Sequence, residues 1–306
     1  RLDHVDGDAD RAGLIRDGVL VWTGYAGEET PGVAASDATR FNVASLTKLV
    51  TAETVLRLVQ AGDVSLDESL GTSWVDPDLA ADPRRNALTP RIALNHRSGF
   101  PNWRFFLPER RLRFLHDPGT HYGYSGEGIE YLARHLAAKL DTPFPDLVRA
   151  QVFEPLRMRG ARLQIDRDAP AHLARPVDED GRFPGYFCRP DGWCRAHGSY
   201  SAADDLSVSV PDFARFLIAV MDHRGYDAAL ARERDRVHTD RGEERAVHCD
   251  AGESPCPVAQ GYGLGFDVLD YGDTRVIGHG GSDWSEMSLA YARLPTREGV
   301  ILFVNA

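Results

Sequence analysis

The sequence has no long apolar run, and it contains few lysines, methionines or cysteines. No window approaches the roughly 18 consecutive apolar residues that a membrane-spanning helix requires. Residues 1–13 are too polar to form the apolar core of a signal peptide. We therefore expect no membrane-spanning helix in this sequence and no signal peptide within residues 1–13.

Positive charge is also scarce. Asp and Glu number 46 against 35 Lys and Arg, which gives a formal net charge of −11 and a pI near 5.5. Nucleic-acid binding draws most of its affinity from clustered positive charge, so this balance argues against an extended phosphate-binding surface. We expect no nucleic acid among the partners.

Lysine occupies only positions 48 and 139. Arginine can replace lysine on a surface, but its guanidinium stays charged and cannot take part in proton transfer. Lys48 is therefore a candidate for chemistry, although two remaining lysines do not by themselves exclude chance.

The rest of the composition is that of a folded protein. Apolar residues make up 42% and charged residues 26% of the 306 positions. These fractions are ordinary for a globular chain and lack the depletion of apolar residues that marks disorder. The length suits one large domain or two closely packed ones.

The four cysteines form two close pairs, Cys188 with Cys194 and Cys249 with Cys256. Each pair brackets turn residues that can bring the two sulfurs together. We predict two local disulfides, and free thiols or a zinc site including His197 or His248 are the alternatives. Disulfides would indicate an oxidising, extracytoplasmic compartment.

Hydrophobic periodicity and turn residues predict sheet at both ends of the chain and helices between them. This pattern indicates an α/β (α+β) fold in which both termini contribute to one antiparallel sheet, flanked by helices, with an inserted and mainly helical region. The predicted domains are 1–61 with 262–306, and 62–261, with the active site between them. The stretch 223–258, dense in charge, is predicted to run over the surface. The predicted strands are 11–16, 19–25, 262–269, 274–279, 285–293 and 300–305, and the predicted helices are 44–60, 126–140, 143–153 and 211–222.

Ser45 and Lys48 lie three residues apart at the predicted start of the first helix. Their side chains therefore lie on one helical face. A serine hydroxyl becomes a good nucleophile when a neighbouring base accepts its proton, and a lysine desolvated at a buried helix start is suited to that role. The pattern occurs by chance in many proteins, so it needs support from elsewhere in the chain.

That support comes from two further motifs, Tyr124-Ser125-Gly126 and His279-Gly280-Gly281-Ser282. With Ser-x-x-Lys first, the three motifs follow the order found in class C β-lactamases and penicillin-binding proteins, a superfamily that includes D-peptidases and esterases. The chain resembles this superfamily over nearly its whole length. The stretches 41–44, 92–99, 154–156 and 261–265 also resemble family landmarks.

The resemblance implies roles for individual residues. Ser45 would form an acyl-enzyme, Lys48 and Tyr124 would move protons, and His279 would lie on the opposite wall of the cleft. Backbone N–H groups of Ser45 and Ser282 would form the oxyanion hole. Side chains at Gly280 and Gly281 would obstruct a substrate lying along the strand. His96 and Ser98 are expected to pin a loop by hydrogen bonds.

Two departures from the family pattern concern Gly126 and the last residues. Gly126 stands where the family has the asparagine of its tyrosine motif, so an amide that would help hold Lys48 and the substrate is missing. Relatives also continue into a helix packed on the sheet, so we expect such a helix after Ala306 or another cover for that face.

Other functions are less well supported by the motifs. An α/β-hydrolase would need a Gly-x-Ser-x-Gly elbow, and residues 123–127 fail at the last position. A metal hydrolase would need a ligand spacing such as His-Glu-x-x-His, which is absent, so no metal or other cofactor is expected. A non-catalytic penicillin-sensing or acyl-sensing domain on the same fold remains an alternative, as does a β-lactamase.

The motifs favour hydrolysis of an ester or amide, including a peptide near a D-residue, over efficient β-lactam turnover. A lysine at position 279 would offer a permanent cation for the carboxylate of a β-lactam, whereas an unperturbed histidine is mostly neutral at pH 7. The loops around 100–115 and 182–200 are expected to shape the substrate pocket. The expected partner is thus a small ester, amide or peptide.

Overall fold

The chain begins with a hairpin whose turn is set by two residues. The computed structural model describes residues 9–305 apart from 169, 179, 246 and 250–254. Strands β1 (Ala9–Arg16) and β2 (Val19–Ala26) pair antiparallel around Asp17 and Gly18. Both turn residues have positive φ, 50° and 73°, as a two-residue turn matching the strand twist requires. The predicted hairpin is confirmed.

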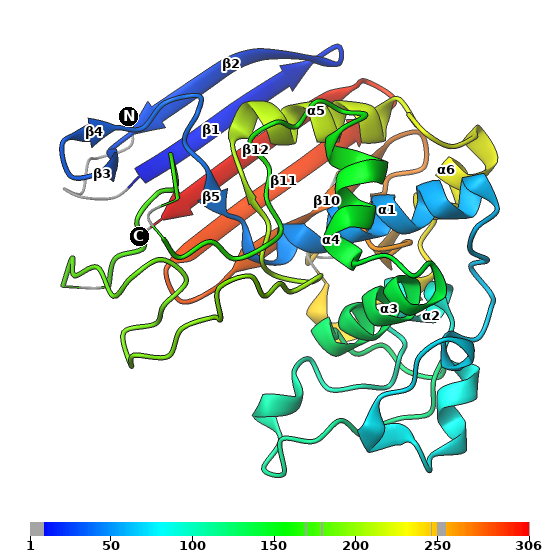
Figure 1. The fold of residues 1–306 in the computed structure, drawn as a ribbon. Coiled ribbons are helices and arrows are strands. Elements are labelled where there is room, and N and C mark those ends of the chain that lie inside the picture. The colour runs from blue at the N-terminus through cyan, green and yellow to red at the C-terminus, as the bar shows by residue number, and fades with distance from the viewer. Residues whose placement is uncertain (1–8, 169, 179, 246, 250–254, 306) are drawn as a thin grey trace. The chain divides into compact units, whose positions relative to one another are not determined.

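Both ends of the chain meet in one sheet. Strand β1 pairs antiparallel with β12 (Glu298–Asn305), which pairs antiparallel with β11 (Glu286–Leu294). Figure 1 shows the blue N-terminal strands beside the red C-terminal ones. The sheet also contains β7 (Thr239–Asp240), β8 (Ala259–Tyr262), β9 (Asp267–Asp270) and β10 (Arg275–Ser282), in the order β2-β1-β12-β11-β10-β9-β8-β7. The predicted mixed α/β fold with a large antiparallel sheet is confirmed.

The chain divides into two compact units. The first comprises the described parts of Arg1–Thr47, Val152–Asp222 and Gly278–Ala306, and the second Lys48–Gln151 and His223–Ile277. The predicted domains, 1–61 with 262–306 and 62–261, are a different division and remain a prediction.

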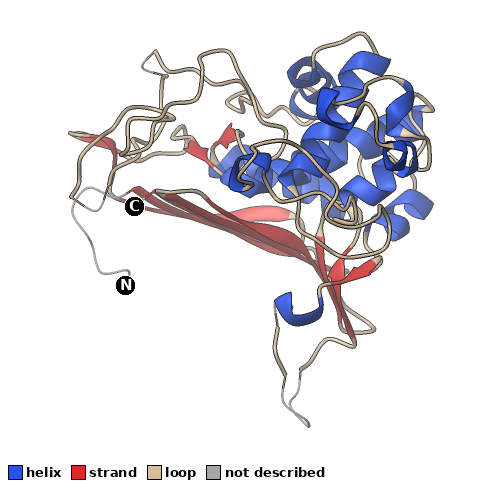
Figure 2. Cartoon of the chain, turned by 90° about the horizontal axis from the view of Figure 1, so that it is seen from below, coloured by secondary structure: helices blue, strands red, loops and turns tan. Residues whose placement is uncertain are grey.

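In the first unit one helix covers the strands. Helix α5 (Val210–Met221) packs on β1, β11 and β12, as Figure 1 shows. Its N-cap Ser209 accepts a hydrogen bond from the Asp212 N–H, and the Phe213 ring meets that of Phe303 edge-on at 5.7 Å. The unit also holds β3 (Glu28–Thr30), β4 (Val33–Ala34), β5 (Phe41–Asn42) and β6 (Ser207–Val208). Its described residues between 153 and 207 form loops and turns, tan in Figure 2.

The second unit is built around helix α1 (Thr47–Ala61), most of which is buried. The helix ends at Gly62, whose φ of +84° suits the left-handed cap, and the Asp63 N–H donates to the Leu58 carbonyl. The described part of this unit also contains the α-helices α2 (Pro90–Leu94), α3 (Gly126–Lys139), α4 (Phe144–Val148) and α6 (Ala228–Arg234), together with several short 3₁₀ turns. A π-helical turn, Arg149–Phe153, follows α4. The predicted helices 44–60, 126–140, 143–153 and 211–222 are thus confirmed in type and place.

Two predictions about local structure are wrong. The stretch 223–258 was expected to be surface loop, but it contains α6, and Arg234 at the end of that helix is fully buried. Arg234 forms ion pairs with Glu53 and Asp235, and such pairing allows a charge to be buried. Residues 262–269 are not one strand, because the chain turns at Gly263–Gly265 between β8 and β9. The charge density of residues 223–258 hid the helix, and the apolar residues on both sides of the turn gave residues 262–269 the pattern of one strand.

Both predicted cysteine pairs are disulfides, Cys188 with Cys194 and Cys249 with Cys256. The zinc alternative fails because disulfide sulfurs are not the thiolates that bind zinc. Among the helices of the described chain, none has the length and apolar character of a membrane span.

Candidate active site

Ser45 lies in a strained and tightly held turn of the first unit. It is the middle residue of a 3₁₀ turn, Ala44–Leu46, that leads directly into α1. Ala44 has a φ of +45°, which is costly for a residue with a Cβ, and the Asn42 side chain accepts a hydrogen bond from the Ala44 N–H. The Val43 N–H donates to the Leu206 carbonyl at 2.9 Å. Strain that is maintained by surrounding contacts is typical of a functional turn.

The strand that carries the glycine motif lies against this turn. A Cβ added at Gly281 would be 3.0 Å from the backbone nitrogen of Ser45 and 2.4 Å from the Val43 carbonyl oxygen. The Ser288 hydroxyl on β11 donates to that same carbonyl at 2.7 Å. Ser282 follows directly and is exposed at the end of β10. The absence of a side chain at Gly281 thus allows the backbone of β10 to approach that of Ser45.

This close approach leads to a prediction for Gly281→Ala. The new methyl group must push β10 away from the Ser45 turn, because the atoms that it meets include backbone. Loss of one oxyanion donor typically costs about 100-fold or more in rate. We expect a fall of at least that size in the rate of acylation, measured with a fluorophosphonate probe.

Gly280→Ala is the matched control for this prediction. A Cβ at Gly280 meets only the Ser288 carbonyl, at 3.8 Å, so the Gly280→Ala variant should have the melting temperature of the parent. Unchanged acylation in Gly281→Ala would show that the close approach plays no part in the reaction.

Lys48 and Tyr124 lie together in the second unit. Lys48 is the second residue of α1 and is 1% exposed, and its Nζ is 4.9 Å from the centre of the Tyr124 ring. Tyr124 comes from the loop before α3 and reaches Lys48 across 76 positions of sequence. The predicted pair of proton-moving groups is therefore adjacent in space.

His96 holds the loop that carries Tyr124. Its carbonyl accepts the Gly123 N–H at 2.9 Å, and its Nδ1 accepts the Ser125 N–H at 3.2 Å. The ring also packs on Tyr124, with the ring centres 4.5 Å apart. The Ser98 hydroxyl accepts the Phe100 N–H at 3.3 Å. These hydrogen bonds are those of the loop-pinning roles that we expected for both residues.

The indole of Trp103 takes the space of the missing amide at position 126. A Cβ added at Gly126 would lie 2.5 Å from the Trp103 ring, and the Gly126 N–H donates to the Asn102 side-chain oxygen at 3.0 Å. The centre of the Trp103 ring lies 6.0 Å from Lys48 Nζ. An aromatic wall therefore stands beside the lysine. Trp103 was not singled out from the sequence, although it belongs to the loop that was expected to shape the pocket.

The aromatic wall extends to two exposed rings. Trp103 stacks on Phe105 with ring centres 5.7 Å apart, and Phe105 meets Phe106 edge-on at 4.7 Å. Phe105 and Phe106 are 48% and 68% exposed. Arg104 fixes the segment, because its guanidinium forms ion pairs at 2.8 Å with both Asp76 and Glu127. The result is an exposed apolar surface on a rigid support.

His279 lies in β10 of the first unit and is 5% exposed. Its Nδ1 forms a hydrogen bond with the carbonyl oxygen of Gly280. A carbonyl can only accept, so Nδ1 carries the proton when the ring is neutral. Of the predicted site residues, the first unit thus brings together Ser45, Gly281 and Ser282 on adjoining backbone, with His279 on the same strand, and the second unit brings together Lys48, Tyr124 and Gly126.

Asp283, which follows Ser282, anchors a disulfide-closed loop. Its carboxylate forms ion pairs with Arg189 at 3.2 Å and with Arg195 at 3.1 Å, and each of these arginines directly follows one cysteine of the Cys188–Cys194 disulfide. Arg195 is desolvated, but the carboxylates of Asp205, Asp204 and Asp283 hold its pKa above the usual value. The loop is therefore tied to the end of β10, a link that no sequence motif indicated.

Glu286 is a buried acid beside this anchor. Burial, assisted by the charge of Asp283, raises its pKa from 4.5 to about 7, while Ser285 and Arg195 act in the opposite direction. Its Oε2 is buried and has no hydrogen-bond partner in the described chain. The folded protein therefore binds this proton more tightly than the unfolded chain does.

A prediction for stability follows from this pKa. Because the folded pKa is raised, stability is greatest below pH 4.5 and is lost as the pH rises to about 7. Glu286→Gln should abolish that loss and gain about 3 kcal/mol on the parent between pH 4.5 and 8, measured by urea unfolding. The exposed Glu298→Gln should keep the parental pH profile. Parallel profiles for the parent and Glu286→Gln would contradict this account of the buried acid.

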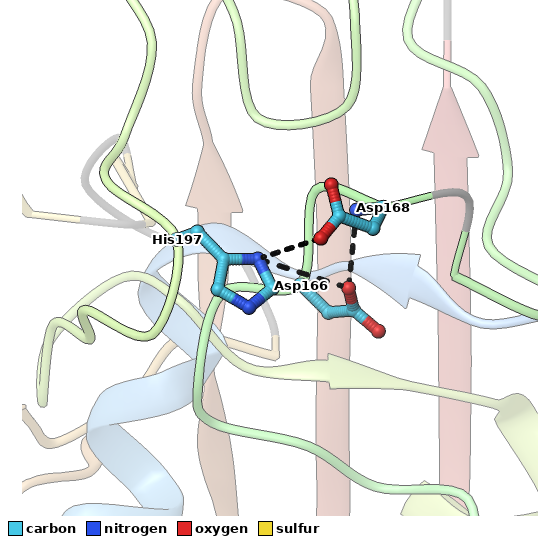
Figure 3. Close-up of side chains that lie close together, drawn as sticks. All are labelled: Asp166, Asp168 and His197. Atoms are coloured by element: carbon cyan, nitrogen blue, oxygen red, sulfur yellow. Dashed lines mark hydrogen bonds and ion pairs between the residues drawn. The ribbon is translucent and has the colours of Figure 1, made fainter.

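One exposed group resembles a metal site in composition. The possible ligand atoms of Asp166, Asp168 and His197 lie within 4.8 Å of one another. Figure 3 shows His197 Nδ1 facing both carboxylates, at 4.0 Å from Asp166 and 3.7 Å from Asp168. All three side chains are exposed, and exposed pairs of this kind contribute little to stability. We assign no ion to them.

Known proteins resemble this chain in sequence and in fold. A family model described as Beta-lactamase matches residues 4–306. The D-alanyl-D-alanine-carboxypeptidase/endopeptidase AmpH of Escherichia coli is 30% identical over 183 residues, which is 51% of this chain and 46% of AmpH. An octameric penicillin-binding protein homologue from Pyrococcus abyssi superposes with a TM-score of 0.78 at 18% identity, over 97% of this chain and 69% of that one. A D-amino acid amidase from Ochrobactrum anthropi SV3, complexed with L-phenylalanine, has a TM-score of 0.73 at 22% identity, over 97% and 85%.

Proposed function

The chain belongs to the beta-lactamase family, and on that basis we propose that it is a serine hydrolase acting through an acyl-Ser45 intermediate. The observation that carries this proposal is the approach of Gly281 to the backbone nitrogen of Ser45, at 3.0 Å from an added Cβ. We infer that the backbone N–H groups of Ser45 and Ser282, on two segments far apart in sequence, form the oxyanion hole. Such a pair of donors stabilises the tetrahedral intermediate of acyl transfer.

In the proposed reaction, Ser45 Oγ attacks the carbonyl carbon of an amide or ester, and its proton passes to the Lys48–Tyr124 pair. The carbonyl oxygen becomes an oxyanion between the two N–H groups. Collapse breaks the bond to the amine or alcohol, which takes the proton from the pair. Water then attacks the acyl-Ser45 ester by the same steps and releases the acid. The Ser45 hydroxyl and the Lys48–Tyr124 pair thereby return to their starting protonation, and the two N–H groups are free to bind the next carbonyl oxygen.

We propose that the acyl group is that of a hydrophobic D-amino acid. The aromatic wall of Trp103, Phe105 and Phe106 offers an apolar surface near Lys48. One structural relative is a D-amino acid amidase that was solved with D-phenylalanine. A histidine rather than a permanent cation at position 279 further disfavours a substrate that requires an ion pair at its carboxylate.

The experiment is a substrate panel on the purified chain. D-phenylalanine amide should be hydrolysed faster than L-phenylalanine amide and D-alanine amide, and a chromogenic cephalosporin should be turned over poorly. Preference for the L-amide would overturn the assigned substrate class. A penicillin adduct that persists for hours, without turnover of any amide or ester, would identify an acyl sensor instead.

Trp103→Ala tests the aromatic wall. Loss of a large ring contact typically costs about 1–2 kcal/mol, so kcat/KM for D-phenylalanine amide should fall about tenfold while that for D-alanine amide changes little. Trp22→Ala removes an indole that is 51% exposed on β2 and serves as the control. Equal losses with both amides would show that Trp103 supports the loop rather than the substrate.

We further propose an extracytoplasmic location. Both disulfides close short local loops, and such bonds persist in oxidising compartments.

A further inference from the structure

The first unit contains a pocket with an unusual concentration of arginine. Its volume is about 880 Å³, within the range of small-molecule sites. Its cationic lining residues are Arg40, Arg157, Arg159, Arg162, Arg215 and His172. None of these residues belongs to the catalytic motifs, so the pocket is a feature separate from the proposed acyl-transfer site.

Only some of these charges are neutralised by the protein. Arg215 forms an ion pair with Asp212 at 2.6 Å, and His172 lies 3.2 Å from Glu29. Within the described residues, no carboxylate lies within 4.0 Å of the guanidinium groups of Arg40, Arg157, Arg159 or Arg162. The lining contains one further acidic residue, Asp37, so its arginines still outnumber its carboxylates.

Two of the four guanidinium groups are held in place by neutral acceptors. Arg40 donates to the Ser207 hydroxyl at 3.1 Å and to the Ala171 carbonyl at 2.9 Å. Arg162 donates to the carbonyls of Arg159 and Ala161, each at 2.8 Å. Burial, with the charge of Arg162, lowers the pKa of Arg40. These groups are therefore positioned by neutral acceptors rather than by an ion pair, and the charge of Asp166, which raises the pKa of Arg40, is outweighed by burial and by Arg162.

The surroundings make this concentration informative. The chain as a whole carries a net charge of −11, and many arginines outside the pocket are paired with carboxylates, as Arg84, Arg104 and Arg241 are. The side chains of Arg157, Arg159 and Arg162 are exposed, so an anion can reach them, and like charges placed together favour the binding of an anion. Guanidinium groups match phosphate oxygens in bidentate geometry, and four of them offer donors for more than one phosphate group.

We propose that this arginine pocket binds a small ligand with two adjacent phosphate groups. The acidic charge of the whole chain excludes an extended nucleic-acid surface, but it does not oppose a local pocket of opposite sign. Arg40 directly precedes β5, the strand that leads into the Ser45 turn, so an occupied pocket would also stabilise the segment that carries Ser45. The proposal concerns binding and does not depend on the proposed hydrolase activity.

The test uses inorganic pyrophosphate as probe, with calorimetry on the whole chain at low ionic strength. We expect one site per chain, with inorganic phosphate at least tenfold weaker. Arg157→Gln/Arg159→Gln should weaken pyrophosphate binding at least tenfold. Arg113→Gln/Arg232→Gln removes the same charge from exposed positions in the second unit and should leave binding unchanged.

Competition then identifies the source of the phosphate groups. Displacement of pyrophosphate by ADP, but not by vesicles of phosphatidylcholine with diacylglycerol pyrophosphate, indicates a soluble ligand, and the reverse indicates a lipid headgroup. No binding of pyrophosphate at 1 mM, roughly the weakest affinity of interest, would overturn the proposal. Equal weakening in the two double variants would also overturn it, because binding would then follow net charge alone.

Discussion

Ser45→Ala is expected to abolish both covalent labelling and turnover. Removal of a nucleophile from a catalytic unit typically lowers kcat by about 10⁴-fold or more, because the remaining groups have no acyl acceptor to activate. The measurement is intact-protein mass spectrometry after a fluorophosphonate or penicillin probe, with peptide mapping, alongside hydrolysis rates. The parent should gain one adduct on Ser45, and the variant none.

Ser282→Ala is the control for this experiment. Only the backbone N–H of Ser282 is assigned a role, and its side chain is exposed at the end of β10, so the variant should be labelled at nearly the parental rate. Labelling of Ser45→Ala at another serine with unchanged kinetics would refute the assignment of the nucleophile.

The second large effect concerns Lys48 and Tyr124, which we expect to act as one coupled proton relay. The two side chains are in contact, because Lys48 Nζ lies 4.9 Å from the centre of the Tyr124 ring. Lys48→Ala and Tyr124→Phe should each lower kcat by about 10²–10⁴-fold, the usual range for acid–base groups. Residues that act together give non-additive losses, so the double variant should be hardly worse than the poorer single variant.

The measurement is a double-mutant cycle in kcat with an ester and an amide substrate. Trp103→Ala combined with Lys48→Ala provides a comparison, because Trp103 is assigned to substrate binding rather than to proton transfer. Multiplicative losses for Lys48→Ala/Tyr124→Phe would show independent roles and exclude the relay.

Several parts of the fold were determined by the sequence alone. Asp17-Gly18 predicted the first hairpin because few residue pairs accept positive φ at both positions of a turn. The helical spacing of apolar residues located the ends of α1, α3 and α5 to within three residues of those observed. Turn residues between the two sulfurs of each pair predicted both disulfides. These features are local, so their causes can be read within a few residues.

Features that depend on residues far apart in the sequence were visible only in the tertiary structure. The burial of Arg234 rests on Glu53, which is 181 positions away, and no local pattern reports such a partner. The turn between β8 and β9 was missed because the apolar residues on both sides read as a single strand. The arginine pocket collects Arg40 with residues more than 100 positions later, so composition indicated only an acidic chain.

In the candidate site, too, some features were determined by the sequence and others only by the tertiary structure. The sequence determined the chemical groups, because Ser45 and Lys48 are one helical turn apart and the tyrosine and glycine motifs follow in the family order. Only tertiary structure showed that Trp103 occupies the space beside Gly126 and that β10 approaches the Ser45 backbone. The physical reason is that residue types and helical spacing are properties of short segments. Vacant or occupied space beside a glycine is set by whatever part of the chain folds against it.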